Sequence, residues 1–439
     1  MYNGISLTKQ ALCAKEYTVN TIAITCKERP ISMEEILESL DRLLAQHTAL
    51  EKVLIIPPDI TRFYSMAGLV TREIYFKLCG RAQVDILPAT GTHVAMTADE
   101  IRRMFGEIPP ERFLTHNWRT DTMLLGTVPA EFVRRVSGGL FETDIGVEVN
   151  RRLYEGGYDL ILSVGQVVPH EVAGMANYSK NIFVGVGGRQ MINKTHMLGA
   201  VCGAEKALGN DHAPVRKVFD YAQESFLKDL PLCYILTVVQ KSGEDVNLHG
   251  LYIGDKRDAF EHAVALSQEL NINYLERPAK KVVAYLEAEE YRTTWVGNKA
   301  IYRTRMIVAD GGELVVLAPG IQAFGENEEV DRAIRAYGYT GTRRILELYK
   351  QGAFENLLMV SAHLIHGSSD GRFKITYATD PRLLSKEDVE SVGFAHMDIQ
   401  DAMQKYDPHV LKYGWNTLPD GEEIYYVDAP GLGLWICRG

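Results

Sequence analysis

The sequence predicts an α/β protein made of two α/β domains. Short apolar runs alternate with amphipathic stretches of helical period along its 439 residues, and this alternation is typical of sheets covered by helices. The pattern restarts near residues 276–280 (ERPAK). We therefore expect a first domain over residues 1–275 and a second over residues 276–439, and the sequence leaves open whether the last strand returns to the first domain. The length agrees, because a single hydrophobic core rarely grows beyond roughly 250–300 residues.

Apolar runs rich in Val, Ile and Leu mark the predicted strands. They cover residues 52–56, 83–87, 159–164, 181–186 and 233–239 in the first domain, and residues 281–286, 313–317, 373–379 and 422–427 in the second. Apolar positions at helical spacing predict helices over residues 69–79, 258–270, 298–308, 328–336 and 342–350. Thr97 and Glu100 form a capping box that opens a further helix, expected to run to about residue 105.

Charge and composition exclude several classes of function. The chain carries 47 Lys and Arg against 57 Asp and Glu, a formal net charge of -10, and it has no long basic run, so we expect no nucleic-acid partner. No apolar stretch approaches the roughly 20 residues of a membrane span, and we see no signal peptide. The six cysteines are far apart and form no C-x-x-C pair, which argues against a disulfide framework or a zinc ribbon. We therefore expect a cytoplasmic protein with no membrane partner.

Three polar residues follow the first predicted strand, at the kind of strand end where open α/β sheets bind ligands. Asp59, Thr61 and Arg62 offer a carboxylate, a hydroxyl and a guanidinium. Arginine binds a carboxylate or phosphate through two parallel hydrogen bonds. The alternative is a capped helix start with an Asp–Arg surface pair.

A second group, Gly91, Thr92 and His93, follows the strand predicted over residues 83–87. Gly91 allows the backbone to approach a ligand closely, and backbone N–H groups ahead of a helix suit an anion such as phosphate. His93 stands where a general base could reach a substrate. An ordinary turn with an exposed histidine would explain the same letters.

His170 follows a third predicted strand and a turn stiffened by proline. His170 and Glu171 begin like the zincin motif H-E-x-x-H, but Gly174 stands at its fifth position, so that motif fails. Lys180 precedes the apolar run over residues 181–186, where partial desolvation could lower its pKa and make it nucleophilic. A solvated lysine at a strand entry is the alternative.

No nucleotide motif of the common kinds is complete. Gly185, Gly187 and Gly188 resemble a dinucleotide turn, but residue 190 is Gln, and a Walker A motif is absent. His93, His170 and His196 could together ligate a metal, or one could ligate while two act as acid and base; their spacing does not choose. The pair His363 and His366 has helical i, i+3 spacing, and we interpret it as structural or surface because no acidic partner is placed around it.

Taken together, these motifs resemble the lactate racemase family, which is known for a nickel-pincer nucleotide cofactor. The resemblance is carried by the order and approximate spacing of Asp59-x-Thr61-Arg62, Gly91-Thr92-His93-x-x-Met96-Thr97-x-x-Glu100, Gly165-x-x-x-Pro169-His170-x-x-Ala173-Gly174, Lys180 and His196. It covers most of residues 50–200, and the length and the two-domain layout also agree.

The resemblance implies a cofactor and the residues that hold it. The cofactor is a pyridinium mononucleotide with two sulfur-bearing arms, held covalently by a lysine that corresponds to Lys180. Nickel, bound by sulfur, carbon and sulfur of the pincer, would take His196 as its fourth ligand, and planar coordination with soft sulfur donors suits Ni(II). Positioning of the cofactor and its loops would fall to Asp59, Thr61, Gly91 and Thr92. Cofactor-synthesis proteins would be needed for maturation.

The resemblance also implies an isomerase that inverts carbon 2 of a 2-hydroxy acid by reversible hydride transfer. His93 and His170 correspond to the two acid/base histidines, and Arg62 corresponds to the arginine that meets the substrate carboxylate or the bound alkoxide. Lys299 corresponds to a second-domain lysine that closes on the substrate in a catalytic cleft between the domains. Loss of hydride gives a flat keto acid to which hydride can return on the other face. A histidine near its reference pKa of about 6.5 can serve as acid or base at neutral pH.

Departures from the family pattern bear on the substrate. The lactate enzymes have small Gly-rich residues just before the lysine, whereas this chain has MANYS at residues 175–179, and Trp295 or Val296 stands where the family has a Gln. The side chains that would make the pocket more polar or change its shape are Asn177, Tyr178, Asn181 and Trp295. We therefore hypothesise a sugar (aldonic) acid such as gluconate, because a pocket that hydrogen-bonds extra hydroxyls discriminates strongly. A racemase of lactate or another short 2-hydroxy acid is the alternative.

Two further interpretations come from other classes of protein. One is a zinc or iron hydrolase or lyase that uses His93, His170 and His196 as metal ligands. This interpretation gives Lys180 no role. The other is a non-catalytic protein of the same fold that binds a sugar acid or a nucleotide.

Overall fold

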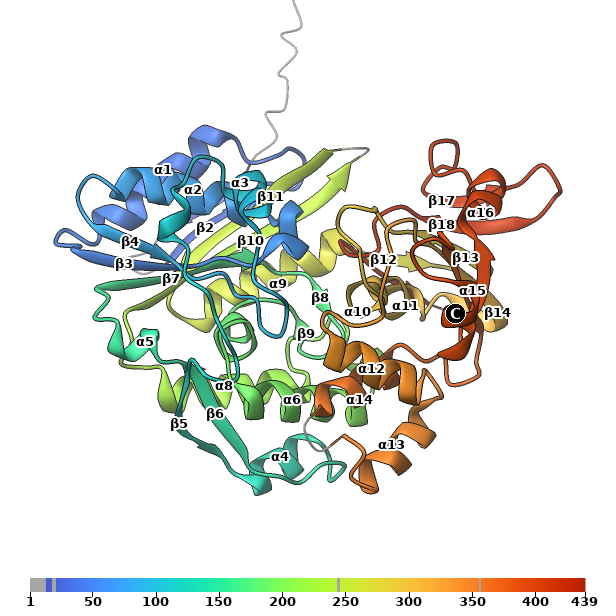
Figure 1. Cartoon of the computed structure of the whole chain (residues 1–439). Coiled ribbons are helices and arrows are strands. Elements are labelled where there is room, and N and C mark those ends of the chain that lie inside the picture. Colours follow the sequence, from blue (N-terminus) through green and yellow to red (C-terminus); the bar gives the residue numbers. More distant parts are fainter. Residues whose placement is uncertain (1–12, 18–20, 243–244, 355–356, 439) are drawn as a thin grey trace, which may run out of the picture.

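The computed structural model describes residues 13–17, 21–242, 245–354 and 357–438, and two large sheets dominate it (Figure 1). The strand order of the first sheet is β1 (Ala14–Tyr17), β2 (Thr21–Thr25), β11 (Asp245–Gly254), β10 (Leu232–Ser242), β7 (Leu160–Gln166), β3 (Lys52–Ile56) and β4 (Gln83–Ile86). The strands from β10 to β4 run parallel, whereas β11, β2 and β1 extend the sheet as antiparallel neighbours. The carboxyl ends of β3, β4 and β7 therefore meet at one edge.

Helices cover both faces of the first sheet, as strands buried on two sides require. Val53 and Ile55 of β3 face one hydrophobic cluster, whereas Leu54 and Ile56 face another, because alternate side chains of a strand point to opposite faces. The first cluster includes residues of α1 (Met33–Ala45), α2 (Ala67–Leu78) and α3 (Ala98–Phe105). The second includes residues of α6 (Arg189–Cys202), α8 (Pro214–Phe226) and α9 (Arg257–Asn271).

The second sheet lies in the later part of the chain. Its strand order is β16 (Ala395–Asp398), β15 (Lys374–Thr379), β14 (Val308–Leu317), β13 (Ala279–Tyr285), β18 (Glu423–Val427) and β17 (Gly414–Thr417). All neighbours run parallel except β17 and β18. One face packs on α16 (Ile399–Lys405). The cluster on the other face includes residues of α10 (Thr294–Gly297), α11 (Lys299–Thr304), α12 (Glu328–Tyr337), α13 (Thr342–Lys350), α14 (Leu358–His366) and α15 (Lys386–Ser391).

Shorter elements connect these layers. They are η1 (Ile60–Ser65), η2 (Pro110–Arg112), the hairpin of β5 (Thr122–Val128) and β6 (Ile145–Asn150) with α4 (Ala130–Val136) between its strands, α5 (Arg152–Glu155), the hairpin of β8 (Pro169–His170) and β9 (Gly174–Met175), η3 (Asn181–Gly185) and α7 (Ala204–Ala207). Finally, β12 (Ile272–Leu275) pairs in parallel with β19 (Leu434–Cys437).

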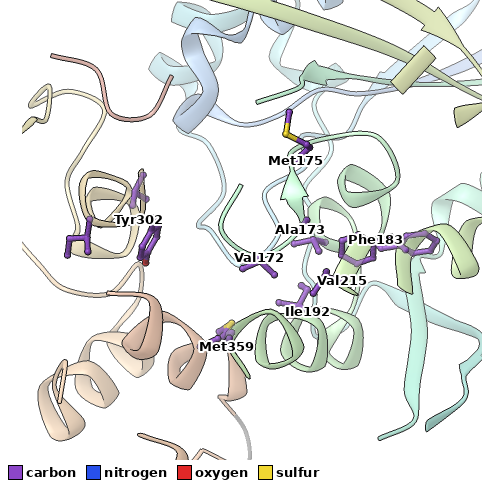
Figure 2. Close-up of a cluster of buried hydrophobic side chains, with 14 of the residues drawn as sticks. Val172, Ala173, Met175, Phe183, Ile192, Val215, Tyr302 and Met359 are labelled. Atoms are coloured by element: carbon purple, nitrogen blue, oxygen red, sulfur yellow. The ribbon is translucent and has the colours of Figure 1, made fainter. Parts of the chain in front are cut away.

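The two sheets are joined by packing as well as by the chain. The expected boundary near residue 275 falls between β12 and β13, and β19 returns to pair with β12, a point that the sequence leaves open. One hydrophobic cluster continues from the first sheet to the second, and within it α14 lies against α6. Figure 2 shows Ile192 and Met359 in this cluster, and the Met359 N–H donates to Asn193 Oδ1 at 3.1 Å. The division into two domains stays a prediction.

Most predicted elements are confirmed, and two are corrected. The strand over residues 52–56, the helix over residues 342–350 and the capping box at Thr97 are present as expected. The strand predicted over residues 181–186 is wrong, because Asn181–Gly185 forms the π-helical turn η3. A short, fully buried apolar run looks the same as a strand or as a helical turn. The helix predicted over residues 298–308 ends at Thr304, and the chain enters β14 at Val308.

One cysteine pair also departs from expectation. Cys13 and Cys26 are joined in a disulfide, because the antiparallel pairing of β1 with β2 places Ala14 opposite Thr25 and so brings the two flanking cysteines together. The pairing of strands, which cysteine spacing does not reveal, decides this contact. In the described ranges, no helix combines the length and apolar character of a membrane span.

Candidate active site

One cavity is lined by all the residues that the sequence analysis assigns to catalysis, cofactor binding and metal binding. It is lined by residues that follow β3, β4 and β7 and by residues of α10, α11 and α14. The predicted residues on its wall are Asp59, Thr61, Arg62, Gly91, Thr92, His93, His170, Lys180, His196 and Lys299. The gathering follows from the parallel strand order, since loops after parallel neighbours lie at the same edge.

His93 is held by a buried carboxylate. Its Nδ1 lies 2.6 Å from Oδ2 of Asp59, and because a carboxylate only accepts, Nδ1 carries the proton. Thr61 donates to the other carboxylate oxygen through its N–H at 3.1 Å and its hydroxyl at 2.6 Å. Burial lowers the pKa of His93, but the charge and hydrogen bond of Asp59 outweigh it, and the net pKa is raised. Nε2 is thereby left as the proton-accepting atom of a strengthened base.

His170 has the opposite hydrogen-bonding polarity. Its Nδ1 accepts from the N–H groups of Val172 at 3.1 Å and Ala173 at 3.4 Å, so the proton of the neutral ring lies on Nε2. Burial, followed by the positive charges of Lys180 and Arg62, lowers the pKa of His170 well below its ordinary value. At neutral pH this ring therefore offers the cavity a hydrogen-bond donor.

His196 has the arrangement of a metal-binding histidine. Its Nδ1 donates to the carbonyl of Ile192, one helical turn earlier in α6, at 2.7 Å, so Nε2 keeps its lone pair. Burial lowers the pKa of His196 to about 4, and the ring stays neutral at physiological pH. Metal ligands of this kind commonly have their other ring nitrogen fixed by a carbonyl or a carboxylate.

Lys180 stands at the start of η3, on the cavity wall. Burial and the neighbouring Arg62 lower the pKa of its amine to about 7. A substantial fraction of the amine is therefore uncharged and nucleophilic at neutral pH. The structure thus supports the expectation of a desolvated lysine, although a helical turn and not a strand follows it.

Lys299 and Arg62 bring positive charge to the cavity from opposite parts of the chain. The Lys299 amine lies 4.0 Å from Glu290 Oε1. Burial lowers the pKa of Lys299 to about 8, with Glu290 opposing and Arg62 reinforcing the change. Cationic groups on two walls suit a small anionic ligand.

The residues proposed to make the pocket polar are only partly in it. Asn177, Asn181 and Trp295 line the cavity. Tyr178 does not: its ring stacks on Phe260 with centroids 4.9 Å apart, and its hydroxyl accepts from Gln223 at 2.6 Å. Asn177 and Tyr178 both adopt left-handed backbone conformations, and the Tyr178 side chain is thereby directed into the core.

Several polar side chains on the cavity wall escaped prediction. The surface interpretation of His363 and His366 is wrong, since both are buried on α14 and line the cavity. Their helical spacing within an apolar segment was a signal for a shared buried face. Glu171 and Arg303 line the cavity too; the second lies one helical turn after Lys299, and only the packing of α11 shows that both residues reach the same wall.

The geometry does not favour a three-histidine metal site. Among the described residues, only Cys13, Cys26 and Glu35 bring three potential metal-ligating atoms within 4.8 Å of one another, and this group does not include the cavity histidines. The failed zincin motif also has a physical reason. Gly174 has φ +77°, and a Cβ there would lie 1.8 Å from the Asn210 carbonyl oxygen, so a histidine cannot occupy this position.

Comparisons with known proteins match the first part of the chain to a known domain. Residues 15–209 match the lactate racemase N-terminal domain. A lactate racemase from Thermoanaerobacterium thermosaccharolyticum is 30% identical over 170 residues, which are 38% of this chain and 35% of that protein. The match therefore spans about a third of that relative's length.

Two solved structures extend the likeness over nearly the whole chain. A protein from Thermotoga maritima has a TM-score of 0.80 and 26% identity, over 93% of this chain and 99% of that one. The lactate racemase apoprotein from Thermoanaerobacterium thermosaccharolyticum has a TM-score of 0.64 and 20% identity, over 94% of this chain and 91% of that one, and this likeness shows the fold.

Fold and cavity thus define a mixed α/β protein with imidazoles, a lysine and an arginine gathered at the edge of its first sheet. Residues 15–209 resemble the lactate racemase N-terminal domain, and the fold of nearly the whole chain resembles that of the lactate racemase apoprotein.

Proposed function

We propose that the protein is an isomerase that inverts carbon 2 of a 2-hydroxy acid. The observation that carries the proposal is that His93 and His170, with opposite hydrogen-bonding polarity, share one cavity with the cationic groups of Arg62 and Lys299. A reaction that removes and restores a hydroxyl proton needs both an acceptor and a donor, and a carboxylate substrate needs cations.

The residues present fit a nickel-pincer nucleotide. Lys180 offers a buried amine with a pKa of about 7, and His196 keeps its Nε2 lone pair. Two buried polar atoms on the same wall, Thr90 Oγ1 and Gln166 Nε2, lack a partner among the described residues. Such atoms are costly unless a ligand satisfies them. When bound, the group would supply a carbon that accepts hydride from carbon 2 and returns it.

The chain's own residues bind the substrate and move its hydroxyl proton. Arg62 and Lys299 hold the carboxylate and fix carbon 2 in the cavity. His93 Nε2 takes the hydroxyl proton while Asp59 stabilises the resulting imidazolium through Nδ1. His170 donates from Nε2 to the substrate oxygen as carbon 2 becomes planar. When the substrate presents its other face, His93 returns the proton as carbon 2 becomes tetrahedral again.

The finer proposal is that the substrate is a sugar acid such as gluconate. Asn177 and Asn181 on the cavity wall support it, and the Asn181 amide is oriented by donating to Ile56 O and Ser163 Oγ, both at 3.0 Å. Lactate or another short 2-hydroxy acid is the alternative substrate. Tyr178 does not line the cavity and so does not support this substrate, whereas Asn177 and Asn181 do.

Protein purified from its native host tests the proposal. Metal analysis and intact mass should show nickel and an adduct on Lys180, and incubation with single epimers of gluconate and of lactate should show which is inverted. Substrate deuterated at carbon 2 should keep its label in the product, because hydride does not exchange with water; loss of the label would contradict hydride transfer. Inversion of lactate alone would refute the sugar-acid substrate, and inversion of neither with fully loaded protein would refute the function.

A further inference from the structure

We propose that Glu171 and Arg303 form a subsite that binds the hydroxyl groups beyond carbon 2 of a polyhydroxy acid. The proposal rests on the proposed function and names residues that would select its substrate. Both side chains line the cavity, and neither takes part in the chemistry derived above.

Their places in the chain put them beside that chemistry. Glu171 directly follows His170, and Arg303 lies four residues after Lys299 on α11. Side chains four apart share one face of a helix, with Cβ atoms about 5–6 Å apart. The pair therefore stands next to the groups that would hold carbon 2 and its carboxylate.

The Arg303 guanidinium has an unpaired hydrogen-bond donor among the described residues. Its side chain is fully buried, with 0% exposure, and it donates to the Gly433 carbonyl from Nη1 at 3.2 Å. Its Nε has no hydrogen-bond partner among the described residues. A guanidinium carries five N–H donors, and leaving them unsatisfied in a buried site costs free energy. A ligand in the cavity would supply the missing acceptors.

Glu171 supplies the complementary acceptor. The carboxylate lies 3.6 Å from His170 Nε2. Burial raises its pKa, but the charge of Arg303, a hydrogen bond from the backbone N–H of Glu171 and the charge of Lys180 outweigh burial. The net pKa is lowered, so Glu171 is ionised at neutral pH. No ion pair within 4.0 Å joins Arg303 to Glu171 in the described part of the chain. Acceptor and donor thus line the same cavity without an ion pair between them.

A hydroxyl group is the chemistry that this arrangement fits. It donates to a carboxylate and accepts from a guanidinium at the same time. His366 Nε2, which is buried and without a partner in the residues that the structure describes, can do either, because its ring is neutral with a pKa lowered by burial to about 4. The methyl group of lactate satisfies none of these groups, and sites built for hydroxyls reject analogues that lack them strongly.

The test measures kcat/KM of the loaded wild-type enzyme along a series of 2-hydroxy acids: lactate, glycerate, a four-carbon aldonate and gluconate. We expect kcat/KM to rise as hydroxyls are added. In Glu171→Gln the ratio of kcat/KM for gluconate to that for lactate should fall about 10- to 100-fold, the loss of a hydrogen bond to a charged group. In His366→Gln the amide of the new side chain stays near the position of Nε2. The ratio of kcat/KM for gluconate to that for lactate should fall in this variant too, by a smaller factor.

Matched surface variants give the controls. Glu224 on α8 and Arg134 on α4 are exposed and do not line the cavity. The gluconate-to-lactate ratio of kcat/KM should therefore not change in Glu224→Gln or Arg134→Lys. If Glu171→Gln does not fold, the wild-type series and His366→Gln still decide. A flat or falling series, or variants that lower both substrates equally, would overturn the subsite while leaving the racemase function intact. A wild type that inverts no 2-hydroxy acid would overturn the function instead.

Discussion

Arg216 donates a hydrogen bond from Nη1 to Ser179 Oγ at 2.9 Å, directly before Lys180 in the chain. It also donates from Nη2 to the Met175 carbonyl at 2.6 Å. The segment that it holds includes Asn177 at φ 61° and Tyr178 at φ 56°, conformations that cost of order 1–3 kcal/mol each in non-glycine residues. Hydrogen bonds from a buried guanidinium, worth about 1.5–3 kcal/mol each, offset that strain and keep the Lys180 amine in the cavity.

Replacing Arg216 should therefore loosen the lysine as well as the fold. We expect Arg216→Met to lower the free energy of unfolding by about 2–4 kcal/mol, because two buried acceptors lose their donor. Urea unfolding measures this, and amine labelling followed by peptide mass spectrometry should show slower, less selective labelling of Lys180. Arg135→Met, an exposed position on α4, is the control. Unchanged stability and labelling in Arg216→Met would contradict the role given to this residue.

Asp59→Asn should shift the pH dependence of the reaction to lower pH. Asp59 raises the pKa of His93 against the effect of burial, so an amide at this position removes the largest opposing influence and the pKa falls. The acid limb of kcat/KM, which reports protonation of the base, should move down by about 1–3 pH units, and the rate should fall about 10- to 100-fold as the base weakens. A limb that stays in place would show that His93 is not the titrating base; Asp99→Asn on the exposed start of α3 is the control.

The same pair makes stability depend on pH. The pKa of His93 is raised in the folded state, so its contribution is complete below about 6.5 and fades as the pH rises through the folded value. The pKa of Asp59 is lowered despite burial, by His93 and Thr61, so its contribution is present above about 3.9 and fades as the pH falls through the folded value. The stability lost in Asp59→Asn should therefore be largest between these limits, which unfolding curves over a pH series will show.

Lys180 should react with amine reagents at unusually low pH. Its labelling rate should follow a midpoint near pH 7, whereas an ordinary lysine titrates near about 10.4. Arg62→Met should raise the midpoint, since it removes the positive charge that, next to burial, lowers the pKa most. Peptide mass spectrometry of apoprotein labelled over a pH series measures both. A wild-type midpoint near that of ordinary lysines would contradict the buried setting of this amine.

Tyr339→Phe should destabilise the wall that α14 gives to the cavity. The His363 ring lies between two hydroxyls, with Tyr302 at 2.8 Å from Nδ1 and Tyr339 at 2.7 Å from Nε2. Loss of one partner of a buried group costs about 1–3 kcal/mol. Denaturant unfolding should show that decrease in Tyr339→Phe and a much smaller one in Tyr349→Phe on α13. Equal effects would mean that the His363 contacts do not stabilise the fold.

The sequence predicted which edge of the first sheet carries the cavity because the relevant signals are local. An apolar run such as residues 52–56 followed by Asp59 and Arg62 reads as a strand and its carboxyl-terminal loop without any knowledge of the rest. The family motifs then joined these loops into one site. The cavity on whose wall His93, His170 and Lys180 lie together agrees with that expectation.

Other features depend on contacts between distant segments. Asn181 enters a π-helical turn in which its side chain donates to Ile56 O and Ser163 Oγ, on two neighbouring strands. Cys13 meets Cys26 because two strands pair. His363 and His366 reach the cavity because α14 packs on α6.

The amino-acid sequence by itself determined the α/β class, most elements, and the residue types and order of the site. The tertiary structure decided the chemistry of these residues. It set the free nitrogen of each histidine, the lowered pKa of Lys180 and the unpaired Nε donor of Arg303. The physical reason is that periodicity acts over a few residues of one segment, whereas burial, charge and hydrogen-bond partners are set by segments far apart in the chain.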